Sequence, residues 1–111
     1  MSLINHYCIT GRNYSFLQDL NIKVIISGAK SKDLSKFPNN WLRDSSGNNI
    51  SYKNKNFGTL TSHYWLWNNE FENLKDDDWI GINHYRRFWI NEETNGINTL
   101  NLKENIQRVI P

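Results

Sequence analysis

One stretch decides the fold class: Trp79-Ile80-Gly81-Ile82-Asn83-His84-Tyr85-Arg86-Arg87-Phe88-Trp89. Its first half is apolar, and its second half is abruptly polar and cationic. Residues 79–83 have the composition of a buried strand. Residues 4–10 and 22–26 are also rich in β-branched and other apolar side chains, and a glycine follows each of them closely. Nearly continuous apolar runs are typical of parallel strands that are covered on both faces. We therefore predict an α/β fold with a mostly parallel sheet and packed helices.

Length and composition narrow the class of protein further. The 111 residues match one domain. The formal net charge of +2 comes from mixed charges, without the dense basic stripe of most nucleic-acid-binding proteins. The single cysteine, Cys8, cannot form an internal disulfide, and we interpret it as an inert core thiol. No stretch reaches the ~20 apolar residues of a membrane span, and the N-terminus does not resemble a signal peptide. We expect a cytoplasmic protein with no nucleic-acid partner and no integral membrane segment.

The most periodic part of the sequence predicts a long helix. Its apolar residues recur at alternating spacings of three and four, which predicts one buried stripe made of Phe57, Leu60, Tyr64, Trp67, Phe71 and Leu74. Asn54 or Asn56 is expected to cap this helix. Trp65 falls off the stripe, so we interpret Trp65 as a ring that faces a ligand and Trp67 as a packing residue.

Two other segments complete the expected organisation. Residues 29–56 contain Pro38, Gly47 and many Ser and Asn residues, which predicts a long loop pinned to the core. Asn101 and Glu104 have the spacing of a capping box, which predicts a helix over residues 101–110.

The cationic end of the 79–89 stretch is the main functional candidate. Alternation along a continuing strand places His84 and Arg86 on one face and Tyr85 and Arg87 on the other. Forked guanidinium groups match phosphate oxygens, and ligands of open α/β sheets bind outside the carboxyl ends of the strands. His84 has the intrinsic pKa of a general base. The alternative is that the arginines pair with nearby carboxylates and that His84 is a structural residue.

The polar segment 47–54 leads into the expected helix. Its candidate ligand-binding residues are Asn49, Ser51, Lys53 and Asn54, because helix N-termini with polar neighbours attract phosphate or carboxylate groups. Plain helix capping is the alternative role for the same residues.

No motif predicts a metal site strongly. Asp76-Asp77-Asp78 contains a D-x-D pattern that suits Mg²⁺ or Mn²⁺, but it precedes a strand and so belongs at the amino edge of the sheet, opposite the expected ligand crevice. We interpret it as a solvated turn, which leaves a divalent cofactor open. Asp44 and Asp19 are isolated in the sequence.

Three ordered blocks carry a family resemblance. They are Gly47-x-Asn49-Ile50-Ser51-x-Lys53-Asn54, then Leu60-Thr61-x-x-Tyr64-Trp65-x-Trp67-x-Asn69, then Ile80-Gly81-x-x-His84-Tyr85-Arg86-Arg87-Phe88, with weaker similarity over Thr10 to Tyr14 and at Gly28. Over about residues 4–90 the chain resembles the bacterial family labelled domain of unknown function 4422. This family occurs in capsular and lipopolysaccharide synthesis proteins and is regarded as glycosyltransferase-like.

The resemblance implies a Rossmann-like sandwich of the GT-A type, present as a partial domain. It implies that residues 1–111 are the N-terminal, donor-binding part of a transferase. Apart from the resemblance, we expect residues 1–3 to be a remnant of cloning. The implied partners are a nucleotide-diphospho-sugar donor and a glycan acceptor, with at most a peripheral contact with the inner membrane. The implied catalytic residues are His84, Arg86 and Arg87. The implied substrate-binding residues are Thr10, Arg12, Tyr14, Gly28, Asn49, Ser51, Lys53, Asn54, Trp65 and Tyr85.

Some positions depart from the family pattern. The family usually has His at Gly11, Asp at Asn48, Glu at Thr59 and Lys at Asn68. The first three departures motivate a second hypothesis, a non-catalytic module that binds glycan or a partner within a larger polysaccharide-assembly protein. A third hypothesis is single-stranded nucleic-acid binding. It is disfavoured because the tryptophans fall on packing stripes.

Overall fold

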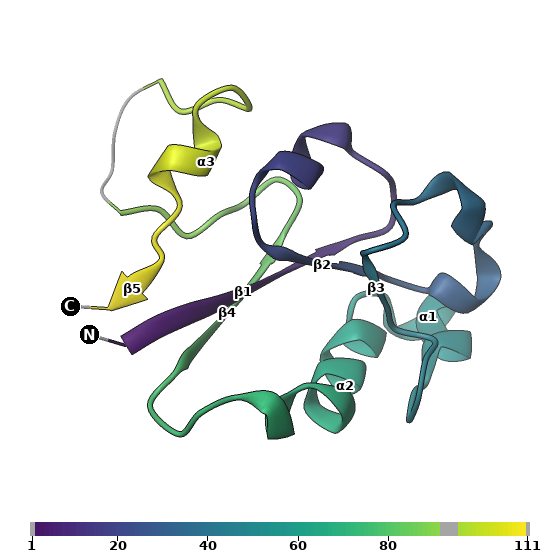
Figure 1. The fold of residues 1–111 in the computed structure, drawn as a ribbon. Coiled ribbons are helices and arrows are strands. Elements are labelled where there is room, and N and C mark those ends of the chain that lie inside the picture. The colour runs from purple at the N-terminus through teal and green to yellow at the C-terminus, as the bar shows by residue number, and fades with distance from the viewer. Residues whose placement is uncertain (1, 92–95, 111) are drawn as a thin grey trace.

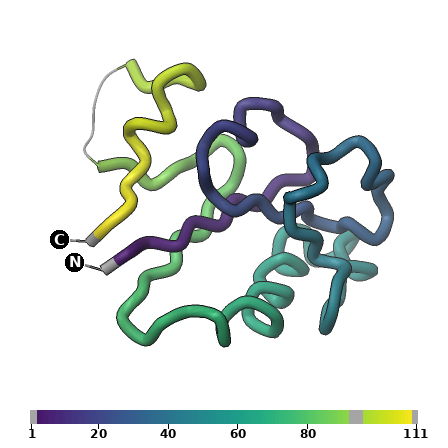
Figure 2. Tube along the Cα trace, in the orientation of Figure 1, coloured from purple at the N-terminus to yellow at the C-terminus, as the bar shows by residue number. Residues whose placement is uncertain are grey.

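The computed structural model describes residues 2–91 and 96–110 and has an α/β fold (Figure 1). Four parallel strands form a sheet in the order β3-β2-β1-β4. They are β1 (Ser2–Thr10), β2 (Lys23–Ile26), β3 (Leu42–Arg43) and β4 (Trp79–His84). A short strand, β5 (Val109–Ile110), pairs antiparallel with the start of β1, so the two ends of the described chain lie side by side (Figure 2).

The helices are short. The α-helices are α1 (Asn54–Phe57), α2 (Leu60–Asn69) and α3 (Leu102–Asn105). Single turns of 3₁₀-helix occupy Ser15–Asp19, Ala29–Ser31, Leu34–Lys36, Ser51–Lys53 and Phe71–Asn73. No helix of the described residues has the length and apolar character needed to cross a membrane.

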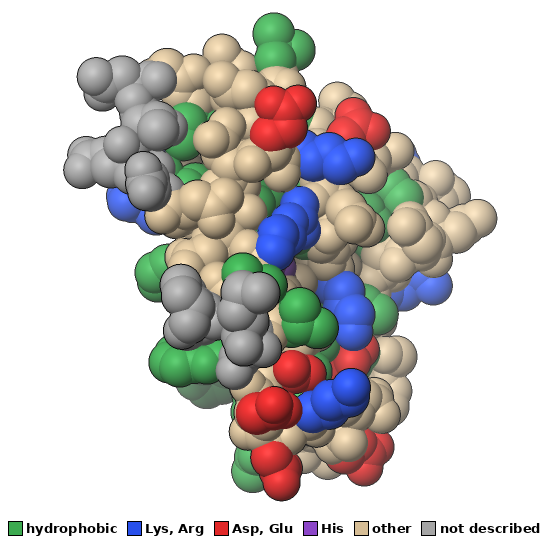
Figure 3. Space-filling view, turned by 60° about the vertical axis from the view of Figure 1, so that its left-hand side comes forward, with side chains coloured by type: hydrophobic (Ala, Val, Ile, Leu, Met, Phe, Trp, Pro, Cys, Tyr) green, Lys and Arg blue, Asp and Glu red, His purple; other side chains and the backbone are tan. Residues whose placement is uncertain are grey.

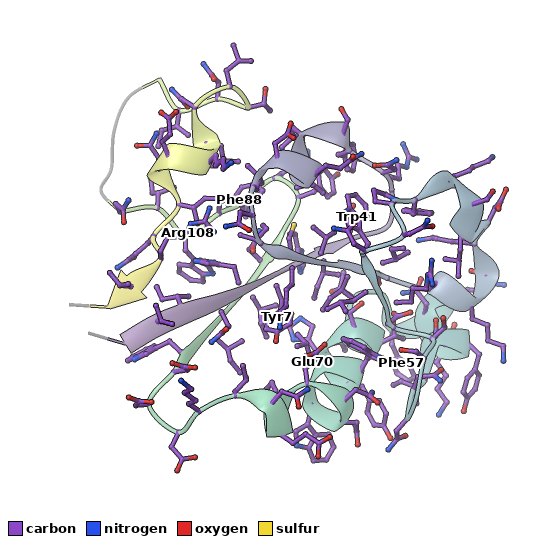
Figure 4. The ribbon with its side chains drawn as sticks, viewed as in Figure 1. Tyr7, Trp41, Phe57, Glu70, Phe88 and Arg108 are labelled. Carbon is purple, nitrogen blue, oxygen red and sulfur yellow. The ribbon has the colours of Figure 1, made fainter. Side chains whose placement is uncertain are left out.

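The sheet is covered on both faces, as the continuous apolar strands predict. Because side chains alternate along a strand, Tyr7 and Ile9 of β1 pack with Trp65 and Leu66 of α2. Cys8 points to the other face, where it joins a cluster that includes Leu17, Trp41, Leu102 and Ile106. Figure 4 shows Tyr7 and Trp41 on opposite sides of the sheet. Burial on both faces makes β1 the centre of the domain.

The strand order creates a topological switch point between β1 and β4. The chain proceeds from β1 to β2 and β3 on one side, and then returns to place β4 on the other side of β1. The carboxyl ends of all four strands lie at one edge, because the strands are parallel. Ligands of open α/β sheets bind at such a point.

The predicted helix over residues 57–74 is wrong in its length and in its buried face. The α2 helix covers Leu60–Asn69, and Trp67 is 64% exposed whereas Trp65 is 4% exposed. Neither Asn54 nor Asn56 caps it, because Gly58 separates α1 from α2 and the cap position of α2 is Thr59. The face that packs on the sheet includes Thr61 and Ser62, whose hydroxyls have buried partners described below.

Two further expectations need correction. The expected loop over residues 29–56 contains β3, whose two residues are too few to show a period. The expected helix over residues 101–110 ends at Asn105, after which the chain extends into β5. Asn101 does not cap α3 with its side chain, because its Oδ1 instead accepts a hydrogen bond from the Asn98 backbone amide at 2.8 Å.

Candidate functional site

A buried carboxylate, Asp44, organises the carboxyl edge near β2 and β3. It directly follows β3 and is fully buried. Its two oxygens accept hydrogen bonds from two backbone amides and three hydroxyls: Gly28 N (2.8 Å), Ala29 N (2.9 Å), Ser51 Oγ (2.7 Å), Thr61 Oγ1 (2.7 Å) and Ser62 Oγ (3.2 Å). Asp44 is isolated in the sequence, but folding brings its donors together from three distant segments.

The expected ligand-binding residues around Asp44 are occupied by structural hydrogen bonds. The Asn54 side chain donates to Ser27 Oγ at 3.0 Å and to the Gly58 carbonyl at 2.8 Å. Gly28 has a φ of 65°, and a Cβ atom there would lie 2.5 Å from Asn54 Oδ1. Glycine at position 28 therefore permits both the left-handed backbone and the close approach of Asn54.

Side-chain hydrogen bonds also hold the turn over residues 47–50. Asn49 donates to the carbonyls of Ser45 (3.0 Å) and Gly47 (2.9 Å), and its Oδ1 accepts from the Ser51 amide at 3.2 Å. Trp65 Nε1 donates to the Ser46 carbonyl at 3.0 Å. The buried Trp65 ring thus packs in the core and does not face a ligand, which corrects its interpretation from the sequence.

Lys53 lies apart from these groups. It is exposed, and its ammonium lies 5.7 Å from the centre of the Tyr52 ring.

Thr10 is buried, and its hydroxyl donates to the Arg12 carbonyl at 2.8 Å. Thr10 therefore shapes the loop that carries Arg12.

The switch point brings together side chains from the loops after β1 and β4. The rings of Tyr14 and Tyr85 stack with centres 4.3 Å apart, and the Arg86 guanidinium lies 5.4 Å from the Tyr85 ring centre. The hydrogen bond with Tyr85 raises the pKa of the Tyr14 phenol, while the charges of Arg12 and Arg86 act in the opposite direction. Four of the residues expected from the sequence therefore meet at one place.

The chain turns at Tyr85 and Arg86, so the predicted strand alternation over residues 84–87 is wrong. The strand β4 ends at His84, and the Arg87 amide donates to the His84 carbonyl at 3.0 Å. This turn groups the side chains differently. Tyr85 and Arg86 border a cavity of about 460 Å³ with Tyr14, whereas His84 and Arg87 border another of about 370 Å³.

The second cavity has both apolar and polar walls. Ile82, Phe88 and Trp89 provide its apolar side, and Asn83 also lines it. The Oδ1 atom of Asn83 is buried without a hydrogen-bond partner among the described residues. The aromatic side of this cavity is chemically suited to the apolar face of a polyhydroxylated ring.

Two basic residues near this edge were not predicted. His63 of α2 lies near His84, and burial, followed by the His84 charge, lowers the pKa of His63. Lys32 donates to the Ser27 carbonyl at 2.6 Å. The sequence signals neither residue, because their positions depend on how α2 and the 29–32 turn pack.

The cations at this edge have no carboxylate partner in the described part of the chain. The ion pair found among the described residues lies at the other end of the sheet. It joins Lys23, at the start of β2, to Glu70, with 3.9 Å between Nζ and Oε2. Arg12, Arg86 and Arg87 are exposed. An anionic ligand would therefore find several guanidinium groups available.

The acidic turn lies elsewhere. Residues 76–78 precede β4 and therefore stand at the amino ends of the strands, as expected from the sequence. Figure 3 shows acidic side chains gathered with a basic one at the lower end of the molecule, where Figure 1 has the chain entering β4. No group of three or more His, Cys, Asp or Glu side chains in residues 2–91 and 96–110 is arranged to hold a metal ion.

Cys8 has the character of a core residue. Its side chain is fully buried, and burial raises the pKa of its thiol to about 12. A thiol with so high a pKa is a poor nucleophile at neutral pH.

Comparison with known proteins defines the family. A sequence model described as Domain of unknown function (DUF4422) matches residues 6–110. The chain belongs to this family. A solved structure of the bifunctional glycosyltransferase WbbM in its apo form is similar, with 32% sequence identity and a TM-score of 0.63. The match covers 88% of this chain and 16% of that chain, so this DUF4422 chain has the fold of a small part of the larger protein. None of the curated proteins compared matches the chain.

Asn48 and Asn68, two positions expected to depart from the family pattern, contact each other. Asn48 Nδ2 donates to Asn68 Oδ1 at 3.0 Å, so the positions that resemble the family's Asp and Lys contact each other in this DUF4422 domain. Asn48 therefore makes a structural contact with α2.

Proposed function

We propose that this DUF4422 domain is the donor-binding part of a glycosyltransferase that uses a nucleotide-diphospho-sugar during capsular or lipopolysaccharide synthesis. The supporting observation is the group of cations without a carboxylate partner among the described residues, together with the stacked tyrosines at the switch point between β1 and β4. The similarity to a bifunctional glycosyltransferase supports the same class of chemistry.

The diphosphate is assigned to the loops after β1 and β4. Arg12 and Arg86 both lie close enough to Tyr14 for their charges to affect its pKa. Guanidinium groups in this position stabilise the charge that develops on a leaving nucleoside diphosphate. The Tyr14 and Tyr85 stack provides an aromatic surface between them.

The sugar is assigned to the neighbouring cavity of about 370 Å³. Trp89 offers an apolar surface for the ring. His84 lines the same cavity and is the candidate general base for an acceptor hydroxyl. Arg87 lies beside it and orients the sugar or its phosphate.

Calorimetry with UDP-, GDP- and CMP-sugars, each with and without Mn²⁺, tests this function. At least one donor should bind, and Arg86→Ala should weaken its binding about tenfold or more, because a charge-assisted hydrogen bond is lost. Lys75→Ala is the matched control, since exposed Lys75 precedes the acidic turn at the amino ends of the strands. Absence of binding to every donor would refute the proposal.

A binding-only role is the second candidate. Asp44, the carboxylate that directly follows a strand of the sheet, is enclosed by five donors and cannot act as a base or metal ligand without breaking them. This observation favours a module that binds glycan or a partner without transfer. Release of free nucleotide from a sugar donor by the complete gene product would exclude the binding-only role.

We also propose that the protein acts in the cytoplasm. Its single thiol is buried and free, which suits a reducing compartment. Cell fractionation of the native host tests this location.

A further inference from the structure

The ammonium group of Lys32 fills the space beside Gly11. Gly11 directly follows β1, and a Cβ atom on it would lie 3.0 Å from Lys32 Nζ. The same Nζ donates to the carbonyl of Ser27, which directly follows β2. Lys32 therefore places a positive charge across the carboxyl ends of the two central strands.

This charge is partly desolvated and has no carboxylate partner among the described residues. Burial lowers the pKa of Lys32, the nearby Asp44 charge raises it, and the Arg12 charge lowers it. The oxygens of Asp44 are already used by their own donors. An ammonium has three N–H groups, so those that do not bond Ser27 remain available for a ligand.

We infer that Lys32 is a ligand-binding residue that forms, together with Arg12, a subsite for the phosphoryl oxygens of the donor. This inference rests on the proposed function, and it adds a residue to the donor site. The lack of a side chain at Gly11 is what lets the lysine reach the end of β1.

A purely structural lysine is the competing explanation, since the bond to Ser27 holds the 27–32 turn. Lys32→Gln separates the two roles, because glutamine keeps an N–H donor for the Ser27 carbonyl but removes the charge. Lys75→Gln is the matched control at an exposed position.

The test is calorimetric titration with UDP and with inorganic diphosphate. Lys32→Gln should weaken both about tenfold, while Lys75→Gln stays within about twofold of the unchanged protein. Gly11→Ala should also weaken both, to a smaller extent than Lys32→Gln, because its methyl group requires a shift of a few tenths of an ångström in the flexible end of Lys32. This variant leaves Lys32 itself intact, so it tests the subsite even if Lys32→Gln does not fold.

The outcomes distinguish this inference from the proposed function. If the unchanged protein binds UDP and both Lys32→Gln and Gly11→Ala bind it equally well, Lys32 is structural and only this inference fails. If the unchanged protein binds neither UDP nor any sugar donor, the proposed function fails and this inference fails with it.

Discussion

Replacement of Asp44 is the most direct test of how the carboxyl edge is held together. The Asp44 side chain is fully buried and accepts hydrogen bonds from Gly28, Ala29, Ser51, Thr61 and Ser62. We expect Asp44→Ala and Asp44→Asn to destabilise the domain to different extents, because alanine removes both acceptor oxygens and asparagine removes one.

The expected magnitude follows from the donors left without a partner. In Asp44→Ala the backbone amides of Gly28 and Ala29 lose their acceptor, and each unsatisfied buried amide costs about 1–3 kcal/mol. The Thr61 hydroxyl costs less, because it can turn to the Gly58 carbonyl at 3.1 Å. Asp44→Ala should therefore lower the free energy of unfolding by roughly 4 kcal/mol.

Asparagine gives a smaller, measurable effect. Its amide nitrogen must face one of the two backbone amides, which leaves one donor unsatisfied and costs about 2 kcal/mol. For a domain of about this size, that change should lower Tm by roughly 10 °C. This graded variant is informative even if Asp44→Ala does not fold.

Urea unfolding followed by tryptophan fluorescence and by circular dichroism measures these changes. Asp76→Asn, in the exposed turn before β4, is the control and should stay within about 0.5 kcal/mol of the unchanged protein. A loss below about 1 kcal/mol in Asp44→Ala would refute the reasoning, because it would mean that the two amides do not depend on this carboxylate.

Three further predictions follow from burial. Trp65→Ala should cost about 3–5 kcal/mol of stability whereas Trp67→Ala should cost less than about 1 kcal/mol, since Trp65 is buried and Trp67 exposed; chemical denaturation of both variants compares them. Burial lowers the pKa of His6 and of His63, so the unfolded state takes up protons first as pH falls below about 6.5. Stability should therefore decrease from pH 7 toward pH 5 and level off below the folded-state pKa values; His63→Gln should make that decrease shallower, and an unchanged slope would contradict the assignment. The Cys8 thiol, with its pKa raised to about 12 by burial, should react with a disulfide reagent only after denaturant is added, and rapid reaction of the native protein would contradict its burial.

The central strands could be predicted because their own residues carry the signal. A strand that is covered on both faces must be mostly apolar, and the buried residues Val24, Ile25 and Ile26 of β2 satisfy this condition. Strand β4, expected to be buried, is only partly so, and Trp79 at its start is exposed. The abrupt change after Ile82 likewise predicted where polar groups gather. Strand β3 could not be predicted, because two residues carry no period and its pairing with β2 exists only in the folded sheet.

Helical spacing showed which residues share a face of α2, but it could not show which face packs. The buried face carries Thr61 and Ser62 as well as Trp65, and the apolar stripe through Leu60 and Trp67 faces outward. The reason lies outside the helix, because the Thr61 and Ser62 hydroxyls are needed by the buried carboxylate of Asp44.

The sequence by itself determined the α/β class, the central parallel strands and the cationic segment that follows β4. The tertiary structure alone decided that this segment turns at Tyr85, that Asp44 gathers donors from three segments, and that Lys32 lies beside Gly11. The physical difference is the range of the interactions. Apolar strand character is a property of neighbouring residues, whereas the buried carboxylate of Asp44 or the ammonium of Lys32 gains its role from groups that only folding brings within hydrogen-bond distance.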